Sequence, residues 1–189
     1  MARLFTGLEI PSEIAQRLTP FRGGLPGARW IEPSDYHITL RFLGEVDGSL
    51  AADLDAGLAE ARARAPFAVT LDGLASFGGD RPRALYASVV LTPELADLQD
   101  EHERIARRAG AEPERRRFTP HVTLARLNRE AEAGAVARYL SEAGVFPHLT
   151  FTVERAALYS ARTSRGGGPY LVEAAYPFGL GDAFEDDED

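Results

Sequence analysis

Hydrophobic and polar positions along this chain follow two periods, which predicts short strands mixed with helices. Apolar residues at every second position favour a strand, and apolar residues three or four positions apart favour a helix. The spacing predicts strands at residues 4–10, 36–43, 67–74, 84–91, 120–127 and 150–159. It predicts helices at residues 13–20, 49–63, 92–109 and 130–142. A last hairpin is expected to pair residues 156–160 with 170–175.

Local signals refine the ends and faces of these elements. Ser12 is expected to cap the first helix, and Thr92, followed by Pro93, is expected to cap the third. Gly44 is expected to end the second strand. His102 lies in the run Asp-Glu-His-Glu-Arg, so we expect it on the solvated face of its helix.

The two halves of the chain repeat the same order of elements. Phe5 aligns with Tyr86 at an offset of 81 residues, and later strands keep nearly the same offset. We interpret residues 1–180 as one domain built from repeats at about 3–77 and 84–159. Short strands mixed with helices in two such halves predict an α+β fold. We expect two pseudo-symmetric lobes, each a mainly antiparallel sheet with helices outside, that face each other across a central cleft.

The composition is that of a soluble globular protein, and it excludes several kinds of site. The chain has 189 residues, of which 44% are hydrophobic and 26% are charged. It has no cysteine, which excludes a disulfide framework, a thiolate metal site and a cysteine nucleophile. It shows neither a leader pattern nor an apolar stretch near the ~18 residues of a membrane span. We therefore expect a cytoplasmic protein that needs neither a membrane nor an obligate protein partner.

The negative charge is concentrated at the C-terminus. The formal net charge is −8, and the last eight residues contain six acids and no base. Without these residues the charge is −2, so we expect residues 181–189 to form a solvated, disordered acidic tail on a nearly neutral domain. A protein that coats long nucleic acid needs a broad basic surface, and this charge argues against that class.

The sequence His-x-Thr-Leu occurs twice, once in each half. The copies begin at His37 and His121, which are 84 residues apart. Side chains alternate across a strand, so each motif should place its His and Thr on one face and apolar residues on the other. By the same rule Arg41 should share the face of His37. A local twofold axis between the halves would bring both His-Thr pairs to one cavity.

Two histidines and two threonines around one cavity suit a displacement at phosphorus. One neutral imidazole can accept a proton from the attacking water, while an imidazolium on the other side donates one to the leaving oxygen. The hydroxyls of Thr39 and Thr123 can donate hydrogen bonds to the non-bridging oxygens. A zinc site made of histidines is the alternative, although neither motif contains Asp or Glu and the usual spacing of two histidines on a helix is missing.

Five segments of the chain form a characteristic series. They lie at residues 3–5, 25–30, 37–44, 118–126 and 158–160. They resemble landmarks of the two-histidine (2H) phosphoesterase superfamily, and most closely of its RNA 2′,3′-cyclic phosphodiesterases, also called the 2′-5′ RNA ligase family. The likeness covers about residues 2–178.

This resemblance implies metal-independent hydrolysis of 2′,3′-cyclic phosphate ends of RNA or nucleotides to 2′-phosphates, with no cofactor. Reverse 2′-5′ ligation of RNA is ascribed to some members. The resemblance implies that His37 is the proton donor and His121 the proton acceptor. It places Thr39, Thr123 and Arg126 at the phosphate and Phe42 at the base or another part of the substrate. Ideal alternation would turn Arg126 and Phe42 away from the cleft unless a bulge intervenes.

A non-catalytic nucleotide-binding module of the same fold is the alternative, because some relatives of this fold bind nucleotides in regulatory proteins. The presence of both histidines and both threonines favours the enzyme. Turnover of a cyclic nucleotide would separate the two hypotheses.

Overall fold

The computed structural model describes residues 2–161 and 169–179, and in these it contains one antiparallel sheet and four α-helices. The strands are β1 (Ala2–Glu9), β2 (Ala28–Trp30), β3 (His37–Val46), β4 (Phe67–Phe77), β5 (Ala84–Val89), β6 (His121–Leu127), β7 (Leu149–Val153), β8 (Arg155–Ala161) and β9 (Tyr170–Pro177). The helices are α1 (Ser12–Leu18), α2 (Gly48–Ala59), α3 (Pro93–Arg108) and α4 (Ala133–Glu142), with short 3₁₀ helices at Thr19–Phe21 and Pro33–Asp35. The α+β class is confirmed, and the predicted acidic tail lies outside the described residues. No described helix is long and apolar enough to cross a membrane.

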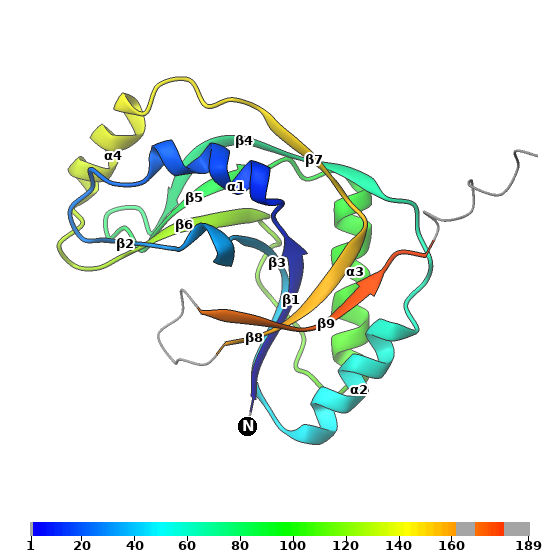
Figure 1. The fold of residues 1–189 in the computed structure, drawn as a ribbon. Helices are drawn as coiled ribbons and strands as arrows, with labels where there is room; N and C mark the ends of the chain where they lie inside the picture. The colour runs from blue at the N-terminus through cyan, green and yellow to red at the C-terminus, as the bar shows by residue number, and fades with distance from the viewer. Residues whose placement is uncertain (1, 162–168, 180–189) are drawn as a thin grey trace, which may run out of the picture.

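The sheet has two halves that meet at the strands carrying the histidine motifs (Figure 1). Its strand order is β7-β4-β5-β6-β3-β1-β8-β9, and β2 adds to β6. A residue pair, Ile38 with Val122, joins β3 to β6. The two lobes expected from the sequence therefore share one sheet.

Two residue pairs mark a local twofold axis. Ile38 pairs with Val122, and the sequence repeat aligns the same two residues. Val69 pairs with Phe151, which the repeat aligns with it at an offset of 82 residues. A residue that pairs with its own counterpart lies next to the axis that relates the two halves. This is the arrangement that a duplicated chain would give.

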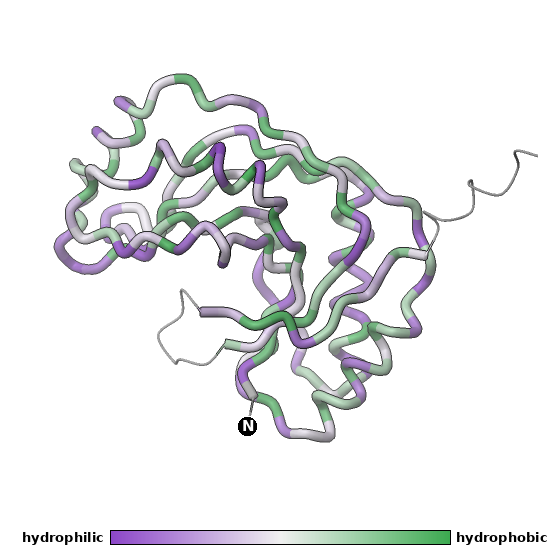
Figure 2. Tube along the Cα trace, in the orientation of Figure 1, coloured by the Kyte–Doolittle hydropathy of each residue, from purple (hydrophilic) through white to green (hydrophobic). Residues whose placement is uncertain are grey.

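The largest apolar core lies between the sheet and helices α1 and α3. Ile38 and Val122 are fully buried in it, and Leu18 of α1 and Leu95 of α3 pack there as well. A second apolar cluster lies between α2 and α3, which are side by side in Figure 1. Hydrophilic positions recur along α1 and α3 in Figure 2, since the outer sides of these helices face solvent. Burial of Ile38 and Val122 leaves the motif histidines on the other face of the sheet.

The ends of three elements test the local predictions. Thr92 caps α3 as predicted, because its hydroxyl accepts a hydrogen bond from the backbone N–H of Leu95 at 3.2 Å. The prediction for Ser12 was wrong, since Pro11 occupies the cap position and α1 starts at Ser12 without a side-chain cap. Gly44 does not end its strand either. It adopts a φ of 73° within the pairing with β1, and β3 continues past it.

His102 is buried rather than solvated, so the prediction for it was wrong. It is 3% exposed, and its Nδ1 lies 2.8 Å from the hydroxyl oxygen of Thr6. Burial, together with the cation of Arg64, lowers the pKa of His102 to about 3. The helical period explains this position, because His102 falls on the same side of α3 as the buried Leu98 and Ile105. The apolar period decided which side of α3 is buried, and the charged neighbours did not.

Gly7 lies where β1 closely approaches β3. A Cβ built on Gly7 would lie 2.6 Å from the carbonyl oxygen of Ile38. Because this neighbour is backbone, Gly7→Ala should lower the free energy of unfolding by about 1–3 kcal/mol, measured by urea denaturation. Gly134→Ala in α4 is the matched control, since a Cβ there meets no atom within 4 Å. Equal stability of the two variants would contradict the close approach.

Candidate active site

A β-bulge in each motif strand changes which side chains face the cleft. Thr6 and Gly7 are adjacent in β1, but their partners in β3, Arg41 and Thr39, are two positions apart. Leu40 is therefore the extra residue of a bulge. The counterpart strand β6 has the same irregularity against β5, and Leu124 is the extra residue there. Beyond each bulge the alternation of side chains is reversed.

The bulges turn Phe42 and Arg126 toward the histidine face. Phe42 is 40% exposed, whereas Arg41 is 6% exposed on the opposite face. The same pattern holds in β6, where Ala125 is fully buried and Arg126 is exposed. The expectation that Arg41 shares the face of His37 was therefore wrong, because the bulge adds one residue before it.

Both motif histidines have the same kind of backbone partner. Nδ1 of His37 lies 2.9 Å from the carbonyl oxygen of Asp35. Nδ1 of His121 lies 2.6 Å from the carbonyl oxygen of Thr119. A carbonyl oxygen can only accept, so Nδ1 donates in both rings and Nε2 of each neutral imidazole is an acceptor. In His37 this Nε2 accepts from the hydroxyl of Thr39 at 3.0 Å.

The two motifs meet at a cavity of about 470 Å³. Four of the six predicted site residues line it, namely Thr39, Phe42, His121 and Arg126. His37 adjoins this cavity through its contact with Thr39. Thr123 follows His121 on the same face of β6, and the Ile38–Val122 pair sets it opposite His37. The wall also includes two aromatic and three arginine side chains, namely Phe77, Phe118, Arg83, Arg116 and Arg117.

Burial and positive neighbours lower the pKa values of both motif histidines. For His37 burial is the largest cause, the carbonyl of Asp35 opposes it, and His121 and Arg126 add to it, so that the pKa falls to about 4. Burial is also the largest cause for His121, whose pKa Arg126 lowers further. Both imidazoles are therefore neutral near pH 7 in the free protein. The pairing of Ile38 with Val122 independently sets the two motifs on neighbouring strands, with His121 opposite Thr39.

Each motif histidine packs against a stacked pair of aromatic rings. Phe5 and Tyr159 stack at a centroid distance of 4.8 Å, and Phe5 lies 4.8 Å from the imidazole of the first motif. Tyr86 and Phe77 stack at 4.1 Å, and Phe77 lies 4.8 Å from the imidazole of the second motif. The sequence analysis did not assign these rings to the site. The sequence repeat could have indicated these rings, because it aligns Phe5 with Tyr86 and Phe77 with Tyr159.

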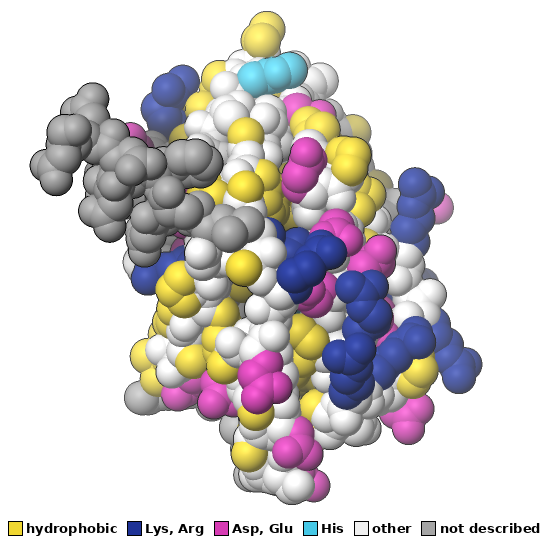
Figure 3. Space-filling model, turned by 90° about the vertical axis from the view of Figure 1, so that its right-hand side faces the viewer, with side chains coloured by type: hydrophobic (Ala, Val, Ile, Leu, Met, Phe, Trp, Pro, Cys, Tyr) yellow, Lys and Arg dark blue, Asp and Glu magenta, His cyan; other side chains and the backbone are white. Residues whose placement is uncertain are grey.

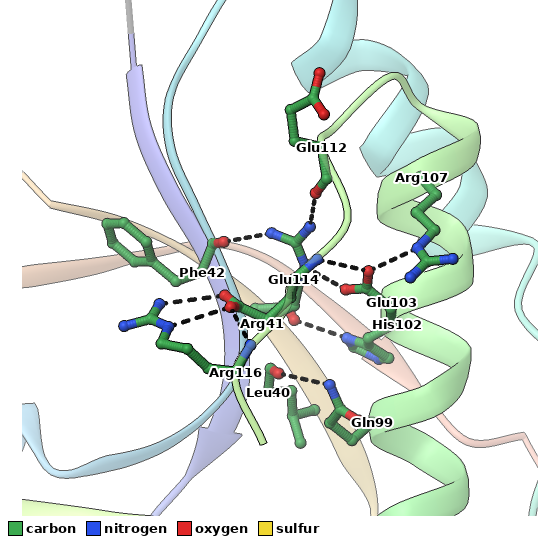
Figure 4. Close-up of polar contacts among 11 residues, drawn as sticks. Leu40, Arg41, Phe42, Gln99, His102, Glu103, Arg107, Glu112, Glu114 and Arg116 are labelled. Carbon is green, nitrogen blue, oxygen red and sulfur yellow. Dashed lines mark hydrogen bonds and ion pairs between the residues drawn. The ribbon is translucent and has the colours of Figure 1, made fainter. Parts of the chain in front are cut away.

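Arg41 holds the loop that leads to the second motif (Figure 4). Its guanidinium pairs with the carboxylate of Glu103 on α3. It also donates to the carbonyl oxygens of Glu112 and, at 2.6 Å, of Phe42. Glu103 in turn accepts from the backbone N–H of Glu114 at 3.0 Å. The loop that continues from there supplies four residues of the cavity wall: Arg116, Arg117, Phe118 and Thr119.

Outside this cavity the charged side chains are mixed in sign. Figure 3 shows the face that carries α2 and α3, where arginines gather among acidic side chains. The groove between these helices is lined by Arg62, Arg104 and Arg108 and by Asp53, Glu60 and Glu101. Within residues 2–161 and 169–179, no three His, Asp or Glu side chains form a cluster that could hold a metal ion.

Comparison with known proteins assigns a family to this fold and site. The sequence model of the 2′-5′ RNA ligase superfamily matches residues 10–165. The chain belongs to this superfamily. The resemblance drawn from the five sequence segments is thereby confirmed.

Individual members of the superfamily are similar to this chain over most of its length. The RNA 2′,3′-cyclic phosphodiesterase of Aeropyrum pernix is 40% identical over 123 residues, which are 64% of this chain and 69% of that protein. The RNA 2′,3′-cyclic phosphodiesterase of Bacillus subtilis is 30% identical over 165 residues, 85% of this chain and 84% of that protein. The crystal structure of Escherichia coli LigT complexed with 3′-AMP matches with a TM-score of 0.73 and 25% identity, covering 93% of this chain and 97% of that one.

Substitution of Arg41 tests whether its ion pair anchors the loop before the second motif. Arg41→Met leaves the carboxylate of Glu103 without its buried partner, so the free energy of unfolding should fall by about 3 kcal/mol or more in a denaturant titration. Arg107→Met is the control, because Arg107 binds the same carboxylate at 2.8 Å from a side chain that is 54% exposed. It should cost less than about 1 kcal/mol. Similar losses for both variants would argue against a special role for Arg41.

Proposed function

We propose that this chain hydrolyses the 2′,3′-cyclic phosphate ends of RNA or of nucleotides to 2′-phosphates, with no metal ion. The observation that carries the proposal is the register of β3 and β6, which sets the two motifs side by side on one face of the sheet, at a cavity that Thr39, His121 and Arg126 line. Nε2 of each imidazole is an acceptor site; in the free protein that of His37 accepts from the hydroxyl of Thr39, which can turn to a bound phosphate instead. The relatives named RNA 2′,3′-cyclic phosphodiesterase support the substrate class.

The two imidazoles take opposite parts in the proton transfers. Nε2 of His121 accepts a proton from water, whose oxygen attacks phosphorus in line with the 3′ oxygen. The bond between phosphorus and the 3′ oxygen breaks, and this oxygen takes a proton from Nε2 of His37. The product carries a 2′-phosphate and a 3′-hydroxyl. Exchange with solvent then returns a proton to His37 and removes one from His121.

The charge that develops on the non-bridging oxygens is stabilised by three side chains. Arg126 supplies the positive charge, and the hydroxyls of Thr39 and Thr123 donate hydrogen bonds. The proposal includes no metal because these groups supply the electrostatic stabilisation that a metal would provide. Phe42, on the same cavity wall, offers an exposed ring to the base or ribose of the substrate.

Binding of the substrate anion favours uptake from solvent of the proton that the acid needs. With its pKa at about 4, His37 is neutral in the free protein near pH 7. A bound phosphate brings a negative charge next to the imidazole and offsets the positive charge of Arg126, which raises the pKa of His37. Protonation of the acid is therefore coupled to binding of the anion.

Ligation uses the same proton transfers with a different nucleophile. When the 5′-hydroxyl of a second RNA takes the place of water, His121 accepts its proton and the phosphorus becomes linked to that oxygen. The 3′ oxygen leaves as before, and the product has a 2′-5′ linkage.

The direct test is incubation of the purified chain with a short RNA that ends in a 2′,3′-cyclic phosphate, with and without EDTA. We expect a 2′-phosphate product at equal rates under both conditions. Binding without turnover would instead support the nucleotide-binding module, and loss of turnover with EDTA would support a metal-dependent reaction.

The motif histidines should each be required for turnover. His37→Ala and His121→Ala remove a positioned acid or base, so each should lower kcat/KM by at least ~100-fold in the cyclic-phosphate assay. His148→Ala is the control, because His148 is exposed and lies on neither motif strand. Near-normal turnover in either motif variant would remove that histidine from the mechanism.

The pH profiles of kcat/KM and kcat should differ. The profile of kcat/KM reports the free protein, in which the pKa of His37 is about 4 and that of His121 is also lowered. Active molecules need His37 protonated and His121 neutral, so the optimum of kcat/KM should lie below the ordinary histidine pKa of about 6.5. Bound phosphate raises both pKa values, which moves the optimum of kcat to higher pH. Coinciding profiles from pH 5 to 9 would be incompatible with this coupling.

A further inference from the structure

The aromatic contacts of the two motif histidines differ. His37 packs against a third ring, Tyr170 of β9, at a centroid distance of 4.9 Å and an interplanar angle of 83°. Among the described residues, the aromatic rings that contact His121 are Phe77 and Tyr86. Strand β9 lies at the edge of the sheet beside β8 and outside both sequence repeats. The repeat therefore supplies no counterpart to Tyr170.

Asp35 connects this third ring to the imidazole. Its Oδ1 accepts from the backbone N–H of Tyr170 at 3.2 Å. Its carbonyl oxygen accepts from Nδ1 of His37 at 2.9 Å. Tyr170 also packs edge-on against Phe5 at 5.2 Å, so the ring is held from two sides. At the second motif the counterpart of Asp35 is Thr119, which has no carboxylate.

We propose that Tyr170 and Asp35 are positioning residues that cover part of His37, reduce its contact with water and thereby make its imidazolium the stronger acid of the pair. The assignment of the donor rests on the proposed hydrolysis, whereas the cover itself does not. The cavity is lined by His121, so the attacking water reaches that imidazole. The imidazole of His37 is partly buried and contacts the rings of Phe5, Tyr159 and Tyr170. Reduced hydration disfavours the charged imidazolium, so a proton that His37 takes up when the phosphate binds is readily given to the leaving oxygen.

Charged and titratable groups face His37 from several elements. They are Asp35 on the 3₁₀ helix before it, Glu9 on β1, His121 and Arg126 on β6, Tyr159 on β8 and Tyr170 on β9. Glu9 is paired with Arg155 at 2.8 Å. Of these groups, His121 and Arg126 lower the pKa of His37, and both stay in place when Tyr170 is replaced. A changed pKa in such a variant therefore reports the cover.

The test is an NMR titration of the histidine side chains in the full chain. Tyr170→Leu removes the covering ring and keeps the backbone N–H, while Asp35→Ala removes the anchor. In both variants water reaches His37, and its pKa should rise by about one pH unit or more. Loss of the Asp35 charge alone would lower this pKa, so a rise in Asp35→Ala has the opposite sign and identifies the cover as its cause.

Asp35→Asn is the matched control, because its side-chain oxygen can still accept from the N–H of Tyr170. The pKa of His37 should stay low in this variant, and that of His121 should stay constant in all three. If circular dichroism shows that Asp35→Ala does not fold, the titration of His37 in Tyr170→Leu alone tests the proposal. The proposal is overturned if His37 titrates in folded Tyr170→Leu as in the unaltered chain, or if both motif histidines shift alike.

Kinetics test the donor assignment separately. In Tyr170→Leu, kcat for a 2′,3′-cyclic nucleotide should fall by about 10-fold with little change in KM, and the optimum of kcat/KM should move to higher pH. A change in KM alone would mean that Tyr170 binds substrate, which would overturn the donor assignment. Absence of hydrolysis in the unaltered chain would remove the proposed function, while the titration would still decide whether Tyr170 covers His37.

Discussion

The pairing of Ile38 with Val122 is the interaction on which the site depends. It joins β3 to β6, and both side chains are fully buried in the core. Because side chains alternate along a strand, burial of these two residues places the adjoining His and Thr of each motif on the opposite face. A slip of one residue in either strand would turn a histidine into the core and an aliphatic side chain into the cleft. The apolar core therefore sets the register, and the register brings the two motifs together.

The bulges at Leu40 and Leu124 have equivalent positions in the two halves, but they direct different kinds of side chain into the cavity. Each bulge directs the fifth residue after the histidine into the cavity, and that residue is aromatic in one half and cationic in the other. The residue before it points to the other face of the sheet. This residue is the charged Arg41 in the first half and the apolar Ala125 in the second, and both are buried. Arg41 thereby ties the first half to Glu103 of α3, and Glu103 in turn holds the loop that precedes the second motif.

Features that depend on period and spacing could be predicted from the sequence, and features that depend on an interruption of the period could not. Alternation was enough to predict most of the strands, the shared face of each His and Thr and the α+β class. It did not predict β2, and it joined β7 and β8 into one strand at residues 150–159, although they lie in different parts of the sheet. It misplaced Arg41, because no local pattern marks Leu40 as an extra residue. Charged neighbours suggested a solvated His102, whereas the apolar period of α3 turned it toward the sheet. The ring over His37 comes from Tyr170, which is distant in sequence and outside both repeats, so only the packed structure could reveal it.

A duplicated site meets a physical difficulty, because hydrolysis with paired imidazoles needs one of them protonated and the other neutral. The repeat supplies equal backbone acceptors and equal stacked rings, and equal surroundings would give equal proton affinities. The difference between the two roles must therefore come from residues that the repeat does not duplicate. Arg126 is one, since it disfavours a second positive charge on either imidazole until an anion is bound. Tyr170 is the other, since its ring covers part of one imidazole, whereas the other imidazole lines the cavity. Together they give a symmetric pair of motifs a direction of proton transfer, and they make that direction depend on a bound phosphate.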